Sequence, residues 1–408
     1  GKIDEMDSKM TVNYMKANYL RASQLIADGS YRDAVPYLKA AAYYSDKMSM
    51  FNQLSRYWIA ESYYRNDQYD KAIELYTELY NISALYKMPE GNLIPFNIAY
   101  CYFMEGDYSS ASRWFREYLD AGDAEYAKEA ALRYADCLFM LSDYAGAAGA
   151  YDTVIEKYFD VNDIYPYYRA AVSYGLEGDN ARKISLLENT GKASPSADFY
   201  SEALFELGRS YVAAEDAAKA SAVFNRLIGT TSDSTYMARS MIELGMLSRN
   251  AEDTDKALEY FKKVVEEFPR SGYADDALLA VESVYQSMNE PEKYLAYIDR
   301  IGKSSVKTEV EKEIMIFNAA EQIYLSGNYQ RALASLQSYM DKYPMGSRYS
   351  QAEFYLAESY RQTGQPEKAC GHYGNVAKDG DGSFKEIAML EFSRLSYDLQ
   401  RYEDALSG

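Results

Sequence analysis

Histidine and cysteine are scarce in this sequence of 408 residues, which holds one histidine and three cysteines. These residue types supply many catalytic bases, nucleophiles and metal ligands. The lone His372 falls in a predicted helix, and the spacing of Cys101, Cys137 and Cys370 fits neither a zinc site nor a redox motif. Phosphate-binding glycine loops and nucleophile elbows are also missing. The sequence therefore predicts no enzymatic activity, no metal site and no cofactor.

Long apolar runs are missing as well. No stretch approaches the roughly 18 uninterrupted apolar residues of a membrane-spanning helix, so we expect no integral membrane span. No signal peptide opens the chain. Because the sequence begins with Gly1 and a polar lead-in, a signal removed from a longer protein stays open.

Basic residues are outnumbered: 43 Lys and Arg stand against 62 Asp and Glu, for a net charge of −19. An acidic chain repels phosphate backbones and anionic membrane surfaces, so we expect no nucleic-acid partner. Two interpretations of the acidity stay open. It gives either a solvated surface that keeps the chain soluble or an attraction for a basic partner.

What the sequence does contain is a repeat, with a period of 36 to 39 residues. We mark each copy by one position, which is alanine in nine of eleven cases: Ala34, Ala72, Ala111, Ala147, Lys183, Ala220, Ala257, Tyr294, Ala332, Ala369 and Ala405. Twelve residues before each mark the side chain is small in ten cases, for example Ala99, Ala135 and Gly208. Four residues after the mark stands a large apolar residue in every copy that extends so far.

One copy illustrates what this spacing predicts. The stretch from Asn97 to Leu119 divides at Gly106 and Asp107 into two amphipathic segments. Glycine can end a helix in the left-handed conformation, and aspartate can cap the next one. Two antiparallel helices approach closely where both carry a small residue, so we expect Ala99 and Ala111 to mark the crossing. The repeat is therefore predicted to be a helical hairpin.

This layout resembles the tetratricopeptide repeat (TPR) family. Tyrosine stands three residues before several marks, as at Tyr108 and Tyr144, and proline stands twelve after two of them, at Pro269 and Pro344. The resemblance implies an all-α, TPR-type α-solenoid, a right-handed superhelix of helix-turn-helix repeats. The period departs from the family's usual 34 residues, and Lys183, Glu282 and Tyr294 break the pattern in two copies.

The domain organisation follows from the repeat. We expect a polar lead-in at 1–13, then a continuous array of about eleven TPR-like repeats over 14–408, the last one truncated. The weak copies lie near 165–190 and 273–301. No capping pattern is recognisable in 384–408, so we expect the native protein to continue beyond that point.

In TPR proteins the first helix of each repeat lines the concave face. By that resemblance, an aromatic cluster projects into or beside the groove and forms the candidate partner-binding site: Tyr57, Tyr64, Phe96, Tyr100, Phe103, Phe139 and Tyr168. Two interpretations stay open, packing between neighbouring first helices and an exposed patch that accepts a peptide. The chaperone-type carboxylate clamp is not matched, because Tyr57, Phe96 and Leu132 stand where that subtype has polar residues.

The resemblance implies a non-catalytic scaffold that binds a protein or peptide partner, and leaves the oligomeric state open. Residues 341–369 look like TPR units of bacterial cell-envelope proteins, which implies a periplasmic or envelope location and a role in envelope assembly. Two alternatives remain. The aromatic cluster fits a glycan-binding TPR-like surface protein, and the array fits a regulatory module of a larger signalling protein.

Overall fold

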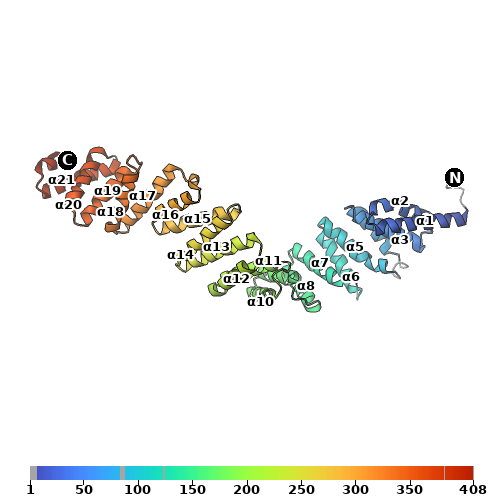
Figure 1. Cartoon of the computed structure of the whole chain (residues 1–408). Coiled ribbons are helices and arrows are strands. Elements are labelled where there is room, and N and C mark those ends of the chain that lie inside the picture. The colour runs from blue at the N-terminus through green and yellow to red at the C-terminus, as the bar shows by residue number, and fades with distance from the viewer. Residues whose placement is uncertain (1–6, 83–87, 123–124, 381, 408) are drawn as a thin grey trace. The chain divides into compact units, whose positions relative to one another are not determined.

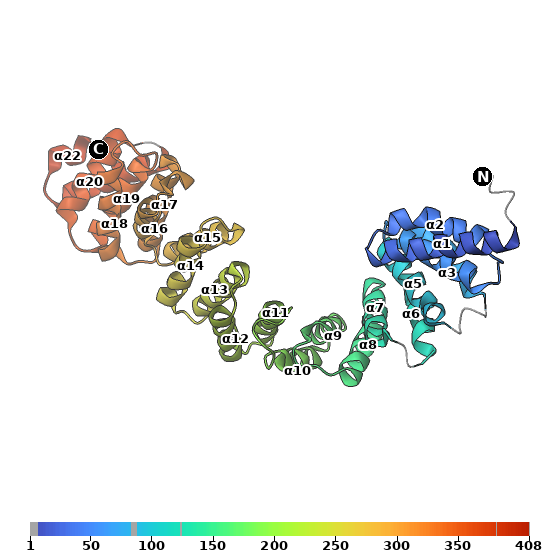
Figure 2. The ribbon, with the colours of Figure 1, turned by 45° about the vertical axis from the view of Figure 1, so that its right-hand side comes forward.

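The fold was analysed in a computed structural model that describes residues 7–82, 88–122, 125–380 and 382–407 (Figure 1). Within these residues the chain forms 22 α-helices, one short 3-10 helix at Ser304–Val306 and no strand. Successive helices pair as antiparallel hairpins, and Figure 2 shows them from a second side. The all-α solenoid of TPR type that the repeat predicts is confirmed.

Eleven hairpins follow one another. Their first helices are α1 (Ser8–Ala27), α3 (Met50–Tyr64), α5 (Pro89–Glu105), α7 (Ala127–Met140), α9 (Ile164–Leu176), α11 (Tyr200–Ala213), α13 (Ser234–Asn250), α15 (Gly272–Ser287), α17 (Glu309–Leu325), α19 (Tyr349–Gln362) and α21 (Gly382–Asp398). Their second helices are α2 (Tyr31–Tyr43), α4 (Tyr69–Tyr80), α6 (Tyr108–Asp120), α8 (Tyr144–Lys157), α10 (Asn180–Thr190), α12 (Ala217–Thr230), α14 (Thr254–Glu267), α16 (Pro291–Arg300), α18 (Tyr329–Lys342), α20 (Pro366–Asp379) and α22 (Tyr402–Ser407).

Contacts among residues divide the chain into an N-terminal region, Gly1–Thr231, and a C-terminal region, Ser232–Gly408. The first holds α1 to α12 and the second α13 to α22. Helix α1 begins at Ser8, inside the expected lead-in, whose residues 1–6 lie outside the described residues. The continuous array over 14–408 stays a prediction, and each region is described by itself.

The turn inside every hairpin has the same backbone geometry. The residue five before each mark has a positive φ, between 55° and 86°: Gly29, Asp67, Gly106, Ser142, Gly178, Glu215, Glu252, Asn289, Gly327, Gly364 and Gln400. The next residue is the N-cap of the second helix, and the Asp107 and Asp143 side chains each accept a backbone N–H there. A left-handed residue followed by a cap thus ends one helix and starts the next, as the sequence predicts.

The core consists of the small and large positions of the repeat. All ten large residues that follow a mark by four are buried, and Ala99, Ala111 and Ala135 are fully buried. A Cβ added to Gly208 would lie 2.5 Å from the Phe224 ring, and one added to Gly245 would lie 2.5 Å from Phe261. The small residue therefore lies directly against the large residue of the same hairpin, which confirms the register of the repeat.

The two weak copies also form regular hairpins, because their charged residues find partners in the following repeat. The Lys183 stem covers Gly175, whose added Cβ would lie 2.8 Å from Lys183 Cδ, and Lys183 Nζ lies 2.5 Å from Glu206 Oε1. Buried Glu282 pairs with Lys307 at 2.9 Å between Oε1 and Nζ. Pairing offsets the cost of burying these charges.

Candidate functional site

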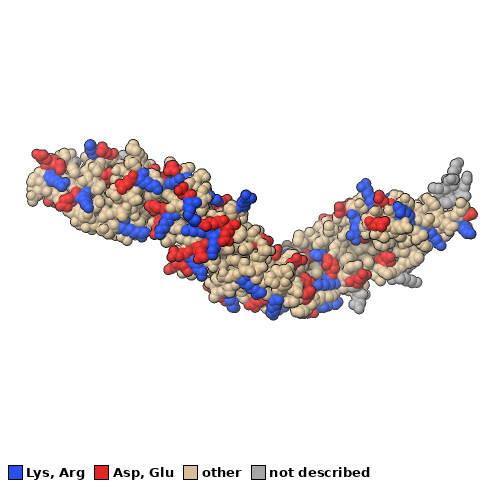
Figure 3. Space-filling view, viewed as in Figure 1, with Lys and Arg blue, Asp and Glu red and all other residues tan. Residues whose placement is uncertain are grey.

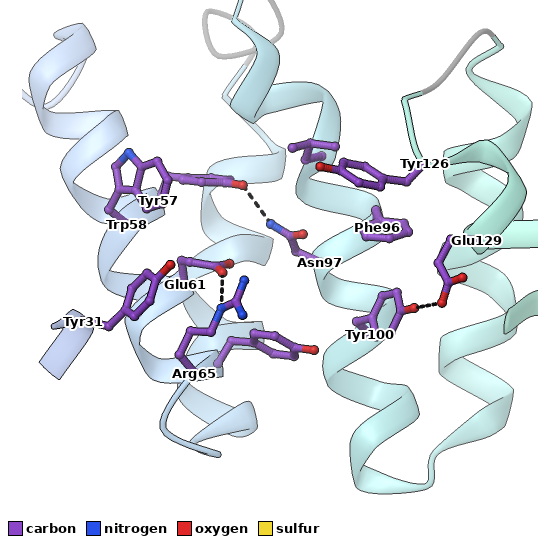
Figure 4. A pocket seen from close by; sticks show the side chains of 12 residues that line it. Tyr31, Tyr57, Trp58, Glu61, Arg65, Phe96, Asn97, Tyr100, Tyr126 and Glu129 are labelled. Atoms are coloured by element: carbon purple, nitrogen blue, oxygen red, sulfur yellow. Dashed lines mark hydrogen bonds and ion pairs between the residues drawn. The ribbon is translucent and has the colours of Figure 1, made fainter. Parts of the chain in front are cut away.

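The candidate site is a cavity of about 460 Å³ in the N-terminal region, where the side chains of α3, α5 and α7 converge (Figure 4). Four of the seven predicted residues line it: Tyr57, Tyr64, Phe96 and Tyr100. The remaining lining residues are Tyr31, Trp58, Glu61, Arg65, Leu93, Asn97, Tyr126 and Glu129. The predicted residues thus include four of the seven aromatic residues of the lining.

Aromatic rings of three consecutive first helices support one wall. Phe96 stacks with Tyr126 at 5.2 Å between ring centroids and meets Tyr100 edge-on at 4.9 Å. Tyr57 is only 4% exposed, and its hydroxyl accepts a hydrogen bond from Asn97 Nδ2 at 3.0 Å. Burial raises the pKa of Tyr57 well above its ordinary value, so this hydroxyl keeps its proton at neutral pH. Tyr57 therefore fixes the wall and presents little surface of its own.

An arginine stands at the α3 side of the cavity. Arg65 Nε donates to Glu61 Oε1 at 2.8 Å, and the guanidinium lies 5.5 Å from the Tyr31 ring and 5.9 Å from the Tyr64 ring. Glu61 is itself held by Tyr76, whose hydroxyl donates to Oε2 at 2.9 Å. The ion pair and the two flanking rings thus contact the guanidinium, while the Arg65 side chain stays 54% exposed.

A carboxylate stands at the α7 side. Glu129 Oε1 accepts hydrogen bonds from the Tyr100 hydroxyl and, at 2.8 Å, from Arg133 Nε. Burial raises the pKa of Glu129, but the hydrogen bonds from Tyr100 and Arg133 outweigh it, and the pKa falls below its ordinary value. Glu129 is therefore ionised at neutral pH.

Arg133 connects this wall to a buried network within the same hairpin, which reaches α9 of the next repeat. Its Nη1 donates to Asp136 Oδ2 at 2.6 Å, and Asp136 Oδ1 accepts from the hydroxyls of Tyr151 and Tyr165, the latter at 2.6 Å. Asp136 is 4% exposed. Because each member is bonded to the next, the network fixes α7 relative to α8 and α9 and supports the cavity from behind.

The other three predicted residues lie outside the cavity lining. Phe103 meets Tyr108 edge-on at 5.5 Å, and Phe139 meets Tyr144 at 5.3 Å, each pair across the turn of one hairpin. The Arg169 guanidinium lies 3.8 Å from the centroid of Phe139, and Tyr168 stacks with Phe199. The contacts of Phe103, Phe139 and Tyr168 are with neighbouring side chains of the chain, as expected if these residues serve packing. A partner-binding role for the predicted residues stays a prediction.

The polar lining residues were missed by the aromatic pattern, although a signal for two of them exists. Glu61 stands eleven residues before its mark and Glu129 eighteen before its own. Most of the predicted aromatic residues stand fifteen or eight residues before a mark. Positions eighteen, fifteen, eleven and eight before a mark are three or four residues apart, so they lie on one face of the first helix. Searching that whole face for any residue type would have found both carboxylates.

Three further findings bear on the site. Lining residues of α8, α9 and α10, together with Phe159 and Val161 after α8, form a second cavity of about 380 Å³.

Among the described residues, none of the helices is both long and apolar enough for a membrane span. Within the residues that the structure describes, no cluster of three or more His, Cys, Asp or Glu side chains is arranged to hold a metal ion.

Family models identify the chain. One tetratricopeptide repeat model matches residues 19–87, 60–126 and 105–158, and another matches 202–230, 236–271 and 351–379. Together these matches span more than half of the sequence. The chain belongs to the tetratricopeptide repeat family. No curated protein matches it.

Solved structures resemble the chain at low identity. The C-terminal part of a TPR repeat-containing protein from Cytophaga hutchinsonii is 17% identical, with 72% of this chain and 98% of that one covered and a TM-score of 0.43. A tetratricopeptide repeat protein from Parabacteroides merdae ATCC 43184 is 12% identical, with coverages of 75% and 98% and a TM-score of 0.38. A structure of Naa15/Naa10 bound to HypK-THB is 12% identical over 96% of this chain and 62% of that one, with a TM-score of 0.46. No function follows from likenesses at this level.

Proposed function

We propose that the protein is a non-catalytic scaffold that holds a segment of a protein partner in the cavity between α3, α5 and α7. One observation carries the proposal: a cavity of about 460 Å³ is lined by rings from consecutive first helices and by a small number of polar groups. Binding sites typically combine apolar walls with few placed polar side chains. Family membership supports a protein-interaction role in general.

The contacts of the rings favour a peptide over a glycan. A sugar-stacking platform needs aromatic faces open to solvent. Tyr57 is 4% exposed, and Phe96 has its ring stacked with Tyr126. Gaps between such rings suit single side chains of a peptide, which enter as anchors.

The location and the wider role are part of the proposal. Residues 341–369 resemble TPR units of bacterial cell-envelope proteins, so we assign the protein to the periplasm or envelope, with a role in envelope assembly. Fractionation of a native host with an antibody against the chain tests this assignment. Recovery in the cytoplasmic fraction alone would contradict it.

Peptide selection tests the binding site. A phage-displayed library of random 12-residue peptides is selected on the whole chain, and enriched peptides are titrated by fluorescence anisotropy. Tyr126 lines the cavity and is 42% exposed, so Tyr126→Ala should weaken binding about tenfold with little effect on the core, a loss of about 1.4 kcal/mol. Phe159→Ala is the matched control, because Phe159 is 73% exposed and lines only the second cavity.

The outcomes separate the two cavities. Binding that falls with Tyr126→Ala and persists with Phe159→Ala supports the proposal. Binding that depends on Phe159 and not on Tyr126 moves the site to the second cavity, and a selection that enriches no peptide contradicts peptide binding altogether.

A further inference from the structure

The two sides of the cavity differ in charge. We infer that the cavity binds a partner segment with charges of both signs, with an acidic residue against Arg65 at the C-cap of α3, an apolar residue between the α5 rings, and a basic residue against Glu129 on α7. The inference rests on the proposed function and names the chemistry of its ligand.

Arg65 is prepared to bind a carboxylate. Only its Nε is bonded to Glu61, and among the described residues its Nη1 and Nη2 make no hydrogen bond or ion pair. Figure 4 shows these two nitrogens directed toward the space between α3 and α5. A guanidinium with two neighbouring free N–H groups offers the fork that matches a carboxylate. The side chain is 54% exposed, so a carboxylate of a partner can reach these groups from solvent.

Glu129 offers the opposite chemistry. Both of its hydrogen bonds are made by Oε1, and Oε2 has no partner among the residues that the structure describes. The side chain is 38% exposed and lines the cavity. Phe96 and Tyr126 line the same wall, and aromatic rings attract a cation over their faces. An ammonium or guanidinium group is therefore favoured at this end.

The space between the two charges is aromatic. Phe96 and Tyr100 project from α5, between Arg65 at the C-cap of α3 and Glu129 on α7 (Figure 4). An apolar side chain there buries its surface against the rings, and a charged one loses hydration without a partner.

The charges of the chain and of the cavity disfavour segments with charges of one sign at both ends. With a net charge of −19, the protein repels a segment that carries only acidic residues. A segment with a basic residue at both ends places one cation beside Arg65. A segment with one charge of each sign avoids both penalties, and only one orientation brings each charge to its partner.

The test repeats the phage selection with three chains: wild type, Arg65→Gln and Glu129→Gln. Glutamine at 129 still accepts from Tyr100 and Arg133, and circular dichroism with thermal unfolding verifies that both variants fold. Glu259→Gln and Lys263→Gln are the matched controls, because these residues form an exposed ion pair on α14, outside the cavity. Individual peptides are then titrated with each chain.

We expect wild-type peptides to share a pattern in which an apolar residue lies between an acidic and a basic residue. Arg65→Gln should remove the preference for the acid alone and Glu129→Gln the preference for the base alone, each weakening a wild-type peptide about tenfold. Replacing either charge of a synthetic peptide by the opposite charge should weaken binding by at least the same factor. The control variants should select the wild-type pattern.

Two results overturn the inference and leave the proposed function intact: enriched peptides without charges that bind through Tyr126, or a charge pattern unaffected by both cavity variants. Equal binding of a peptide and of its counterpart in which one charge is replaced by the opposite charge contradicts the pairing with Arg65 and Glu129. Failure of the wild type to enrich any peptide contradicts the proposed function itself, so the two failures are distinguishable.

Discussion

Two cavities, one in the N-terminal and one in the C-terminal region, have different chemistry at the same repeat position. Eight residues before the mark stands Tyr64 in one cavity and Gln286 in the other. One cavity of the C-terminal region, of about 200 Å³ between α15 and α17, has a lining rich in side-chain amides, which include Asn318 and Gln322. The candidate site in the N-terminal region has aromatic rings and paired charges instead.

Their buried positions, in contrast, are alike. Phe115 in one region and Phe261 in the other stand four residues after a mark, and both are fully buried. Large and small residues recur where they pack, while lining residues change from repeat to repeat. Stability is therefore built in the same way throughout, and recognition is local to the repeats that carry a suitable lining.

The largest expected effect comes from overpacking this shared core. Ala99→Leu in the N-terminal region and Ala357→Leu in the C-terminal region should each destabilise the protein by about 1–3 kcal/mol, because both alanines are fully buried twelve residues before a mark. Urea unfolding monitored by circular dichroism measures this. Ala145→Leu and Ala334→Leu, at exposed helix positions, serve as controls. Unchanged midpoints for both buried variants would show that the assigned register is wrong.

A smaller effect should distinguish buried from exposed carboxylates. Buried Glu313 accepts hydrogen bonds from the Tyr339 hydroxyl at 2.9 Å and the Ser347 amide at 2.6 Å. Burial raises the pKa of Glu313, but these bonds outweigh it and leave the pKa below its ordinary value. Its ionised form therefore stabilises the fold above the unfolded-state pKa of about 4.3, and this contribution is lost as pH falls through the folded-state pKa.

We expect Glu313→Gln to cost about 1–2 kcal/mol at pH 7 and progressively less below about pH 4.5. Urea midpoints of wild type and variant between pH 7 and pH 3 measure the difference. Glu129→Gln in the N-terminal region should also lower the free energy of unfolding at pH 7. The loss should be smaller, because that side chain is 38% exposed. A difference for Glu313→Gln that grows toward acid pH contradicts this account.

The smallest effect is expected at the single histidine. His372 Nδ1 lies 3.4 Å from Glu353 Oε1, its ring stacks with Tyr360, and its side chain is 26% exposed. His372→Ala should change the free energy of unfolding by less than about 1 kcal/mol. It should leave the affinity of peptides selected through the N-terminal cavity unchanged. Loss of that binding, or of an enzymatic activity of the chain, would show a role for His372 that the comparison omits.

Packing positions could be predicted from the sequence because they recur. Gly208 and Gly245 stand where only a small residue fits against Phe224 and Phe261, and one period locates both. The helix turns followed from the same period. Because the same residue type recurs at the same position in most repeats, the packing positions can be assigned, and a residue such as Lys183 is recognisable as an exception.

The site could be predicted only in part, because an aromatic residue in the same row serves two purposes. Tyr64 meets Tyr69 across its turn at 5.7 Å and also lines the cavity, whereas Phe103 has the equivalent turn contact with Tyr108 and does not line it. Residue type cannot separate these cases, because side-chain direction and neighbouring repeats decide them. Arg65 and Asn97 needed the same three-dimensional information.

The left-handed residue in the turn of each hairpin has a consequence for changes in chain length. Inserting one residue into a helix such as α6 turns all later side chains of that helix by about 100° about its axis and misplaces its buried face. Removing 107–142 instead joins Gly106 to Asp143, which is itself the N-cap of α8 and normally follows a left-handed residue. A left-handed residue is therefore still followed directly by an N-cap at that junction, and α8 can begin as before. Gene duplication and deletion can therefore lengthen or shorten this chain by whole repeats, and the spacing between two binding sites along it changes in steps of about 37 residues.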